Sequence, residues 1–245
     1  NNTLFSLSKK LNLFYIEHNK YVGGRYSVFS ETGIIPAFLM GINISKFRSK
    51  ISNFLISSEK SFLKDSSLML SELLLSKKLN NLILLNYSPQ LEQFLFWCQQ
   101  LIAESLGKKG KGFLPLISNV PKDHHSLLQL YLDGPKDKLF YIFSCEGASQ
   151  NIINIQKGFR INNLLDKKKL SSIKKAQKEA LIKTFIKNKI PYREFKIKKI
   201  NEEVLGILFS YFMLETVIVA KLVKINPYDQ PAVEQVKLFT KNFLS

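Results

Sequence analysis

The sequence contains little cysteine and little histidine, and this scarcity argues against two classes of site. Cys98 and Cys145 are its two cysteines, so no disulfide framework is predicted and a reducing, cytoplasmic compartment is favoured. Cys98 is expected to be a buried thiol. The three histidines are His18, His124 and His125, and no Cys or His spacing matches a zinc site. We therefore expect no metal centre.

The N-terminus shows no signal peptide, and the chain starts with Asn1 rather than Met, which suggests a fragment. Long uninterrupted apolar runs are also absent. One run, residues 204–223, approaches the length that crosses a bilayer. Glu215 and Lys221 interrupt it, and a glutamate in the middle of a membrane is costly. We predict a buried core helix there, and no membrane partner.

Acidic residues are few: 19 Asp and Glu stand against 36 Lys and Arg, which gives a net charge of +17. A polyanion such as nucleic acid could be the reason. A solvated basic surface is the favoured interpretation, because the lysine groups are scattered and few aromatic residues lie among them. A positive field would also attract a small anionic substrate. The lysine groups are 9–10, 108–111, 167–169 and 196–199.

Helical periodicity alternates with short apolar runs along most of the chain. This alternation predicts an α/β fold, a three-layer sandwich with a parallel sheet between helices, and ligands at the carboxyl ends of its strands. Pro115 disfavours a central position for its strand. A loop is expected around Gly147 and Gly158. Strands are predicted near 13–16, 82–85, 113–117, 139–143 and 192–199, and helices near 4–7, 30–57, 66–78, 88–106, 123–132, 164–187, 204–223 and from 231 onward.

Polar residues with catalytic potential lie in one of these helices and in a turn near the N-terminus. Gln100 and Glu104 are four residues apart near the end of a predicted helix that Gly107 terminates, so their side chains share one face. Glu104 is therefore a candidate general base, although a lone glutamate at a helix end is usually a solvated surface residue. A turn with paired glycines precedes Arg25, which would project into whatever that turn lines.

Two further segments carry polar groups. His125 and Gln129 are predicted to share the face of a helix, although a pair of capping histidines is the simpler interpretation. Near the C-terminus, Gln230 precedes a helix that Pro231 begins. Lys237 lies about two turns into that helix, and its apolar residues Val233, Val236 and Phe239 are expected to cover the packed side.

Four motifs together resemble those of the glucose-6-phosphate isomerase family. They are Val22–Ser27 with Gly-Gly-Arg, Gln100–Lys108 with Gln-x-x-x-Glu-Ser-x-Gly-Lys, His125–Gln129 with His-x-x-x-Gln, and Tyr228–Lys237 with Asp-Gln…Val-Glu…Lys. They occur in family order and span nearly the whole chain. The chain departs from the family pattern in the last motif, where Ala232 and Val236 replace glycines, and after the Gly-Gly-Arg turn, where Glu31 and Thr32 are more polar than expected.

The resemblance implies an aldose–ketose isomerase of glycolysis and gluconeogenesis that interconverts glucose 6-phosphate and fructose 6-phosphate. By this resemblance Glu104 is the base that moves a proton between C2 and C1 of the sugar. Arg25 stabilises the cis-enediolate, and His125 assists ring opening with Lys237 beside it. A guanidinium suits the arginine's role because it keeps its charge.

The same resemblance assigns substrate-binding roles to Gln100, Gln230 and Gly24. It implies a hexose 6-phosphate substrate and no cofactor or metal. It also implies a homodimer in which His125 of one subunit serves Glu104 of the other. Whether mannose 6-phosphate is also a substrate is left open by the sequence.

The domain organisation is also implied by the resemblance. Residues 1–30 correspond to the end of a truncated first sugar-isomerase-type (SIS) domain, 31–80 to connecting helices, 81–200 to the second α/β domain and 201–245 to C-terminal helices. The Ser/Thr-rich phosphate-binding loop belongs upstream of this C-terminal portion, so little activity is expected of the chain alone.

Two alternatives to an isomerase remain. One is a non-catalytic sugar-phosphate-binding module of the same fold, which would need no base and is therefore disfavoured by the retention of Glu104. The other is a nucleic-acid binder, which the net charge alone motivates.

Overall fold

The computed structural model describes residues 2–57, 59–146, 165 and 168–244. The loop predicted around Gly147 and Gly158, and the predicted helix start at Leu164, lie outside these residues. The strands are β1 (Asn81–Asn86), β2 (Leu114–Asn119), β3 (Lys138–Cys145) and β4 (Tyr192–Ile197). The helices are α1 (Thr3–Lys10), η1 (Gly24–Phe29), α2 (Glu31–Leu39), α3 (Ile44–Arg48), α4 (Asn53–Ile56), α5 (Glu59–Ser76), η2 (Pro89–Leu91), α6 (Glu92–Leu106), α7 (Lys122–Ser126), α8 (Leu128–Asp133), α9 (Leu170–Lys187), α10 (Glu202–Leu222) and α11 (Pro231–Leu244).

The sheet has the order β2-β1-β3-β4, and its neighbouring strands are all parallel. The central strands β1 and β3 are almost continuously buried, as strands covered on both faces must be. Pro115 lies in β2 at one edge, where a residue without an N–H is tolerated. The predicted parallel sheet, four of the five predicted strands and the edge position of Pro115 are confirmed.

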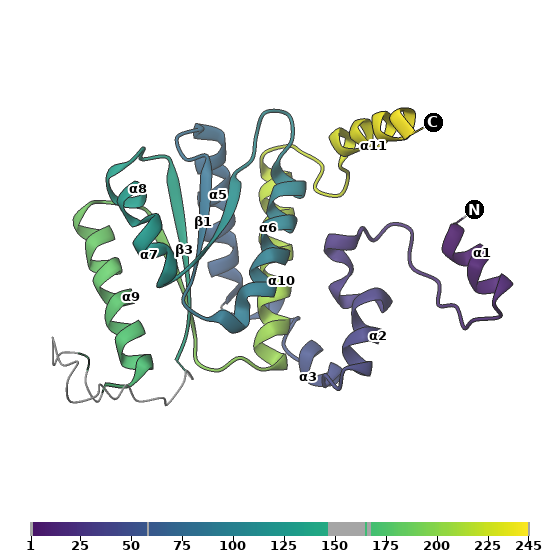
Figure 1. Ribbon diagram of the computed structural model, residues 1–245, viewed down its shortest axis with the longest axis horizontal. Coiled ribbons are helices and arrows are strands. Elements are labelled where there is room, and N and C mark those ends of the chain that lie inside the picture. Colours follow the sequence, from purple (N-terminus) through teal and green to yellow (C-terminus); the bar gives the residue numbers. More distant parts are fainter. Residues whose placement is uncertain (1, 58, 147–164, 166–167, 245) are drawn as a thin grey trace.

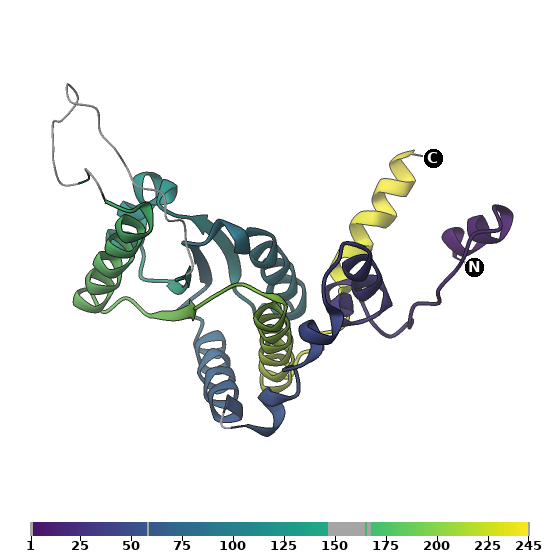
Figure 2. The ribbon, with the colours of Figure 1, turned by 90° about the horizontal axis from the view of Figure 1, so that it is seen from below.

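Helices cover both faces of the sheet, which gives three layers (Figures 1 and 2). Successive residues of β1 point to opposite faces, so Leu82 and Leu84 join one core while Ile83 and Leu85 join the other. The first core is formed with α5, α6 and α10, and the second with α8 and α9. Cys98 on α6 is fully buried in the first core, and this burial raises the pKa of its thiol.

Helix α10 has the length and hydropathy of a membrane-crossing helix, yet half of its most apolar window is buried inside the protein. Asn201 caps it by accepting a hydrogen bond from the backbone N–H of Val204 at 2.9 Å. Helix α10 crosses α3 at Gly206. The position requires glycine, because a side chain there would collide with the carbonyl oxygen of Phe47. Glu215 is buried and pairs with Arg193 at 2.8 Å. The predicted core helix is confirmed.

Three predictions about the elements are wrong. Residues 13–16 form no strand, because no strand among the described residues pairs with them, and Phe14 is 90% exposed. The predicted helix over 30–57 is three short helices, with Gly41 in a left-handed conformation between the first two. The predicted helix over 123–132 breaks at Leu127 into α7 and α8.

Two terminal helices project from the α/β body on the same side, α1 at the N-terminus and α11 at the C-terminus (Figures 1 and 2). Helix α11 begins at Pro231, as predicted, but it contains no buried residue among those described. Val233, Val236 and Phe239 are exposed, so the prediction that they cover a packed side is wrong within this chain. The apolar face of α11 lacks a partner among the described residues.

Candidate active site

Arg25 is the centre of a polar cluster that joins three distant parts of the chain. The residue lies in η1 and is only 4% exposed. Its Nε donates to Ser105 Oγ at 3.0 Å, and its Nη1 donates to Glu104 Oε2 at 2.9 Å and Gln230 Oε1 at 3.3 Å. Nη2 donates to the carbonyl oxygens of Pro227 at 2.6 Å and Asp229 at 3.1 Å. All five guanidinium donors therefore have acceptors.

Glu104 reaches this cluster because helix α6 ends beside η1. The carboxylate accepts from Arg25 on Oε2 and from Gln100 Nε2 on Oε1 at 3.0 Å, one helical turn earlier. Its side chain remains 30% exposed, so part of the carboxylate faces solvent. The helix ends at Gly107. Glycine fits this position because a side chain there would collide with the carbonyl oxygen of Ala103. The predicted shared face of Gln100 and Glu104 is confirmed.

The segment between α10 and α11 is held against the end of α6 by two lysines. Lys108 Nζ donates to the carbonyl oxygen of Asn226 at 2.5 Å and pairs with Asp229 Oδ1 at 2.9 Å. Lys111 Nζ donates to the carbonyl oxygen of Val223 at 2.6 Å. These contacts fix the backbone whose carbonyl oxygens bind Arg25, and they place Gln230 within its reach.

Electrostatics and burial reinforce this arrangement. The ammonium of Lys108 lowers the pKa of the Asp229 carboxyl through a hydrogen bond. Tyr26 lies beside Arg25, and its hydroxyl is hydrogen-bonded with Ser105 Oγ at 2.8 Å. Burial raises the pKa of the Tyr26 hydroxyl, so the phenol stays neutral at physiological pH.

The cluster lies at the amino ends of the strands, not at the carboxyl ends. Glu92 at the start of α6 accepts from Asn119 Nδ2 at the carboxyl end of β2, and Gln99 Nε2 donates to the carbonyl oxygen of Pro115 near the start of β2. Glu104 is about 18 Å of helix beyond Glu92, at 1.5 Å per residue. The prediction that the site residues meet at the carboxyl edge is therefore wrong for Arg25 and Glu104.

Neither glycine before Arg25 is required by backbone conformation. Gly23 has φ −70°, and Gly24 also lies outside the left-handed region. A side chain at either position would meet no atom of the described residues within 4 Å. The space beside Gly24 is thus open within this chain, which leaves room for a ligand or another chain.

Lys237 does not join the cluster in this chain. It lies on α11, its side chain is 60% exposed, and its Nζ pairs with Glu234 at 2.7 Å. Gln230 precedes the same helix and does reach Arg25, so the last predicted motif is divided between the cluster and a projecting helix.

His125 is also separate from the cluster. It is exposed on α7, which follows the carboxyl end of β2. His125 and Gln129 lie on two different short helices, so the prediction that they share one helix face is wrong. The neighbouring His124 is fixed by a hydrogen bond: its Nε2 is hydrogen-bonded with the Tyr87 hydroxyl at 2.9 Å. Burial lowers the pKa of His124.

Sequence reasoning missed several groups that build the cluster. Ser105 and the backbone carbonyl oxygens of Pro227 and Asp229 bind the guanidinium, and Trp97 Nε1 donates to the carbonyl oxygen of Arg25 at 3.0 Å. Ser105 follows Glu104 directly, so its place inside a motif was a usable signal. Backbone acceptors carry no sequence signal, because every residue has a carbonyl oxygen.

The cluster has the chemical parts for proton transfer at carbon. A partly exposed carboxylate can accept a proton from a carbon next to a carbonyl. A guanidinium within hydrogen-bonding distance of that carboxylate can stabilise the oxyanion that forms, because its charge is permanent. Among the described residues, no group of three or more His, Cys, Asp and Glu side chains is arranged to hold a metal ion.

No family model matches the sequence. Several curated proteins are similar to it in sequence. A glucose-6-phosphate isomerase from Methanocaldococcus jannaschii is 32% identical over 232 residues, which are 92% of this chain and 56% of that protein. One from Mycoplasmopsis synoviae is 33% identical over 245 residues, covering 96% of this chain and 56% of the relative. The chain spans about half the length of the curated relatives it matches.

Solved structures give the same comparison in three dimensions. The hypothetical protein TT0462 from Thermus thermophilus matches with a TM-score of 0.88 and 26% identity, over 99% of this chain and 60% of that one. A glucose-6-phosphate isomerase from Chlamydia trachomatis matches with a TM-score of 0.74 and 16% identity, over 95% of this chain and 48% of that one. The latter likeness concerns the fold alone.

Proposed function

The chain is homologous, over nearly its whole length, to part of the glucose-6-phosphate isomerases, and we propose from this premise that it supplies the proton-transfer machinery of such an enzyme. The reaction is the interconversion of glucose 6-phosphate and fructose 6-phosphate through a cis-enediol. The observation that carries the proposal is the direct contact between Arg25 and Glu104 at 2.9 Å, beside Gln100 and Gln230. A module that only binds sugar phosphate has no need of a carboxylate placed beside a permanent cation.

Glu104 is the general base in this proposal, and Arg25 stabilises the enediolate. The longest of the five guanidinium hydrogen bonds is the one to Gln230, at 3.3 Å. Nη1 would exchange this bond for the developing oxyanion, while the bonds to Ser105 and to the backbone keep the guanidinium in place. Gln100 would hold the carboxylate in one rotamer and, with Gln230 and the open space at Gly24, would contact the sugar.

The domain assignment is part of the same proposal. Residues 81–200 form the second sugar-isomerase-type α/β domain, residues 1–30 end the first, residues 31–80 connect them, and residues 201–245 are C-terminal helices. The four-stranded parallel sheet within 81–200 supports this division. The phosphate of the substrate would be bound by a part of the protein outside this chain. Glycolysis and gluconeogenesis in the cytoplasm are the corresponding pathways and compartment.

We further propose that the active site is shared between two subunits. Within one chain His125 lies near the carboxyl end of β2, whereas Glu104 lies near the amino end of that strand. A second subunit could bring its own His125 to Glu104, and contact between subunits could also fold α11 and Lys237 toward a site. The uncovered apolar face of α11 supports such a contact.

The test is a coupled isomerase assay on the complete natural protein that contains this chain. Glu104→Gln should lower kcat about 10²–10⁴-fold, the usual contribution of a positioned general base, and leave the fold intact. Glu72→Gln is the matched control, because Glu72 is exposed on α5 away from the cluster. The chain alone should show little activity. Wild-type protein without isomerase activity, or a Glu104→Gln variant with the kcat of wild type, would overturn the proposal.

A further inference from the structure

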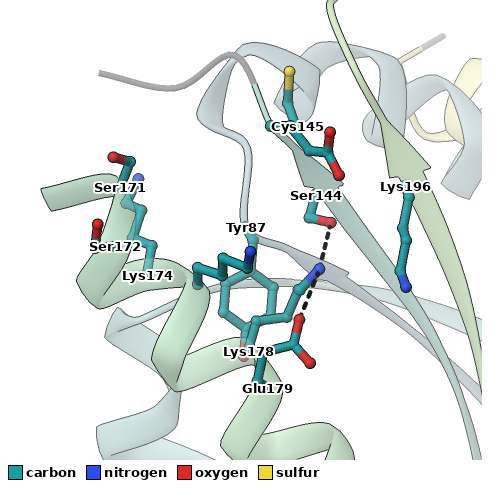
Figure 3. Close-up of a pocket in the computed structure, with 11 residues that line it drawn as sticks. Tyr87, Ser144, Cys145, Ser171, Ser172, Lys174, Lys178, Glu179 and Lys196 are labelled. Carbon is teal, nitrogen blue, oxygen red and sulfur yellow. Dashed lines mark hydrogen bonds and ion pairs between the residues drawn. The ribbon is translucent and has the colours of Figure 1, made fainter. Parts of the chain in front are cut away.

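A cavity of about 470 Å³ lies at the carboxyl edge of the sheet, away from Arg25 and Glu104 (Figure 3). The connection from β1 leads to β2 on one side, and β3 lies on the other side of β1. Open α/β sheets bind ligands in the crevice at such a topological switch point. Tyr87 follows β1 and Ser144 lies near the end of β3, so the cavity opens where this rule places a ligand.

We call this space the switch-point cavity, and it is lined by Tyr87, Ser144, Ser171, Ser172, Lys178 and the residues named below. Lys178 is only 8% exposed and forms its innermost cation. Its Nζ donates to Ser144 Oγ at 3.2 Å and pairs with Glu194 at 2.6 Å (Figure 3 shows the bond to Ser144). A buried cation with this network is fixed in position before any ligand arrives.

The walls carry an excess of positive charge. Four lysines line the cavity, Lys174, Lys175, Lys178 and Lys196, against the two glutamates Glu146 and Glu179. Glu194, behind the wall, pairs with both Lys178 and Lys196. Lys174 and Lys175 lie on α9 and line the cavity, and they have no ion-pair partner in the part of the chain that is described. These two ammonium groups are therefore available to an anion.

We propose that the switch-point cavity binds a small organic phosphate, a phosphate monoester. A phosphate dianion accepts several hydrogen bonds at once, and the cavity offers ammonium groups with the hydroxyls of Ser171 and Ser172. A dianion is favoured over a monoanion because the four lysines of the lining outnumber its two glutamates, so the net attraction grows with the charge of the ligand. The ring of Tyr87 provides an apolar wall for the carbon skeleton. The volume lies within the range of small-molecule sites.

This site is distinct from the proposed isomerase site. The cavity adjoins the carboxyl ends of β1 and β3, and the Arg25 cluster lies at the amino ends of the strands. The inference therefore stands whether or not the chain belongs to an active isomerase, and its test uses neither a hexose phosphate nor an activity assay.

The test is an NMR titration of the whole ¹⁵N-labelled chain with glycerol 3-phosphate at constant ionic strength, with glycerol as the uncharged control. Saturable shifts are expected at the backbone amides of Tyr87, Ser144, Ser171 and Ser172. Lys174→Ser combined with Lys175→Ser should weaken binding roughly tenfold, because hydrogen bonds to two charged groups are lost. Lys175 is exposed, Lys174 is half-buried, and neither belongs to the core, so the variant should fold.

A matched control is the pair Lys183→Ser and Lys187→Ser, which removes the same charge from exposed positions farther along α9. This variant should bind as the wild type does. Equal weakening by the two double variants would mean that net charge alone attracts the probe, and would overturn the proposal. Shifts confined to the surroundings of Trp97 and Ser105 would overturn it as well, since they would place the phosphate at the Arg25 cluster.

Discussion

The guanidinium of Arg25 donates to the carboxylate of Glu104 at 2.9 Å, and so joins the first motif of the chain to the helix of the second. The same guanidinium holds the loop before α11 through the carbonyl oxygens of Pro227 and Asp229. One side chain therefore has two duties. It places a permanent charge beside the proposed base, and it holds together three segments that are far apart in sequence.

Replacing Arg25 should therefore cost stability as well as chemistry. Arg25→Met leaves the carbonyl oxygens of Pro227 and Asp229 without their donor and should lower the free energy of unfolding by about 3–5 kcal/mol, the range for breaking a buried ionic network. Urea unfolding followed by Trp97 fluorescence measures this loss of stability, because the indole donates a hydrogen bond to the backbone carbonyl oxygen of Arg25. Arg48→Met, at an exposed position on α3, is the control and should change stability by less than about 0.5 kcal/mol.

The contact between Lys108 and Asp229 should depend on pH. The pKa of Asp229 is lowered in the folded protein by its hydrogen bond with Lys108, so the contact stabilises the fold fully above the ordinary carboxyl pKa. This contribution is lost as pH falls through the lowered pKa, below 3.8. In Lys108→Met the pKa of Asp229 should rise toward 3.8, as measured by carbon-detected NMR titration. An Asp229 pKa that is the same in the variant and the wild type would contradict the assignment.

His18 should titrate above its ordinary pKa. It is hydrogen-bonded and ion-paired with Glu31, and its other nitrogen contacts the carbonyl oxygen of Val22, so the pKa of His18 is raised above 6.5. The stabilisation is complete below pH 6.5 and is lost as pH rises through the raised pKa. Glu31→Gln should return the His18 pKa toward 6.5 in a proton NMR titration, and His124, which has no contact with Glu31 and whose pKa burial lowers, is the internal control.

The ionic network formed by Glu215 on α10 should contribute strongly to stability. Glu215 is buried and accepts from Arg193 at 2.8 Å and from the hydroxyl of Tyr211 at 2.5 Å. Glu215→Ala leaves the largely buried guanidinium of Arg193 among aromatic rings without its carboxylate, and should destabilise the protein by about 3–5 kcal/mol. Glu203→Ala on the same helix removes a surface pair with Lys50 and should cost at most about 1 kcal/mol. Thermal unfolding distinguishes the two.

A shared active site makes a prediction for mixed dimers. Glu104→Gln and His125→Ala variants should each be nearly inactive alone. A mixed dimer keeps one site with both groups intact, so random mixing of subunits should restore about a quarter of wild-type activity, given two-fold symmetry. Mixing the two variants after denaturation and refolding, followed by the coupled assay, measures this. Absence of any recovery would show that His125 and Glu104 act within one subunit, and a His125→Ala variant that is active alone would show that His125 is not needed.

The positions of the buried strands follow from the sequence, because a buried parallel strand is a short apolar run with a recognisable composition. Leu82–Leu85 and Leu139–Phe143 fall inside the observed β1 and β3. Two of the failures share a cause. The apolar residues at 13–16 and on α11 carry an amphipathic signal that the sequence reports, but the surface that would cover them is not among the described residues of this chain.

The sequence predicted which residues belong to the site, but not where in the fold they meet. The four-residue spacing of Gln100 and Glu104 is a property of one helix, and local geometry was enough to put both side chains on one face. The partners of Arg25 lie 80 residues away at Ser105 and 202 away at Pro227, and two of its five bonds are to backbone oxygens that any sequence would supply.

By itself the sequence determined where the four strands and most of the long helices form, that the sheet is parallel, and which polar side chains have catalytic potential. Those properties depend on short-range periodicity and residue type. Only the tertiary structure decided that Arg25, Glu104 and Gln230 meet at the amino ends of the strands, while His125 and Lys237 lie elsewhere in the chain. That decision rests on how α6 runs back along the sheet and on where buried donors find acceptors, and both are set by packing between segments distant in sequence.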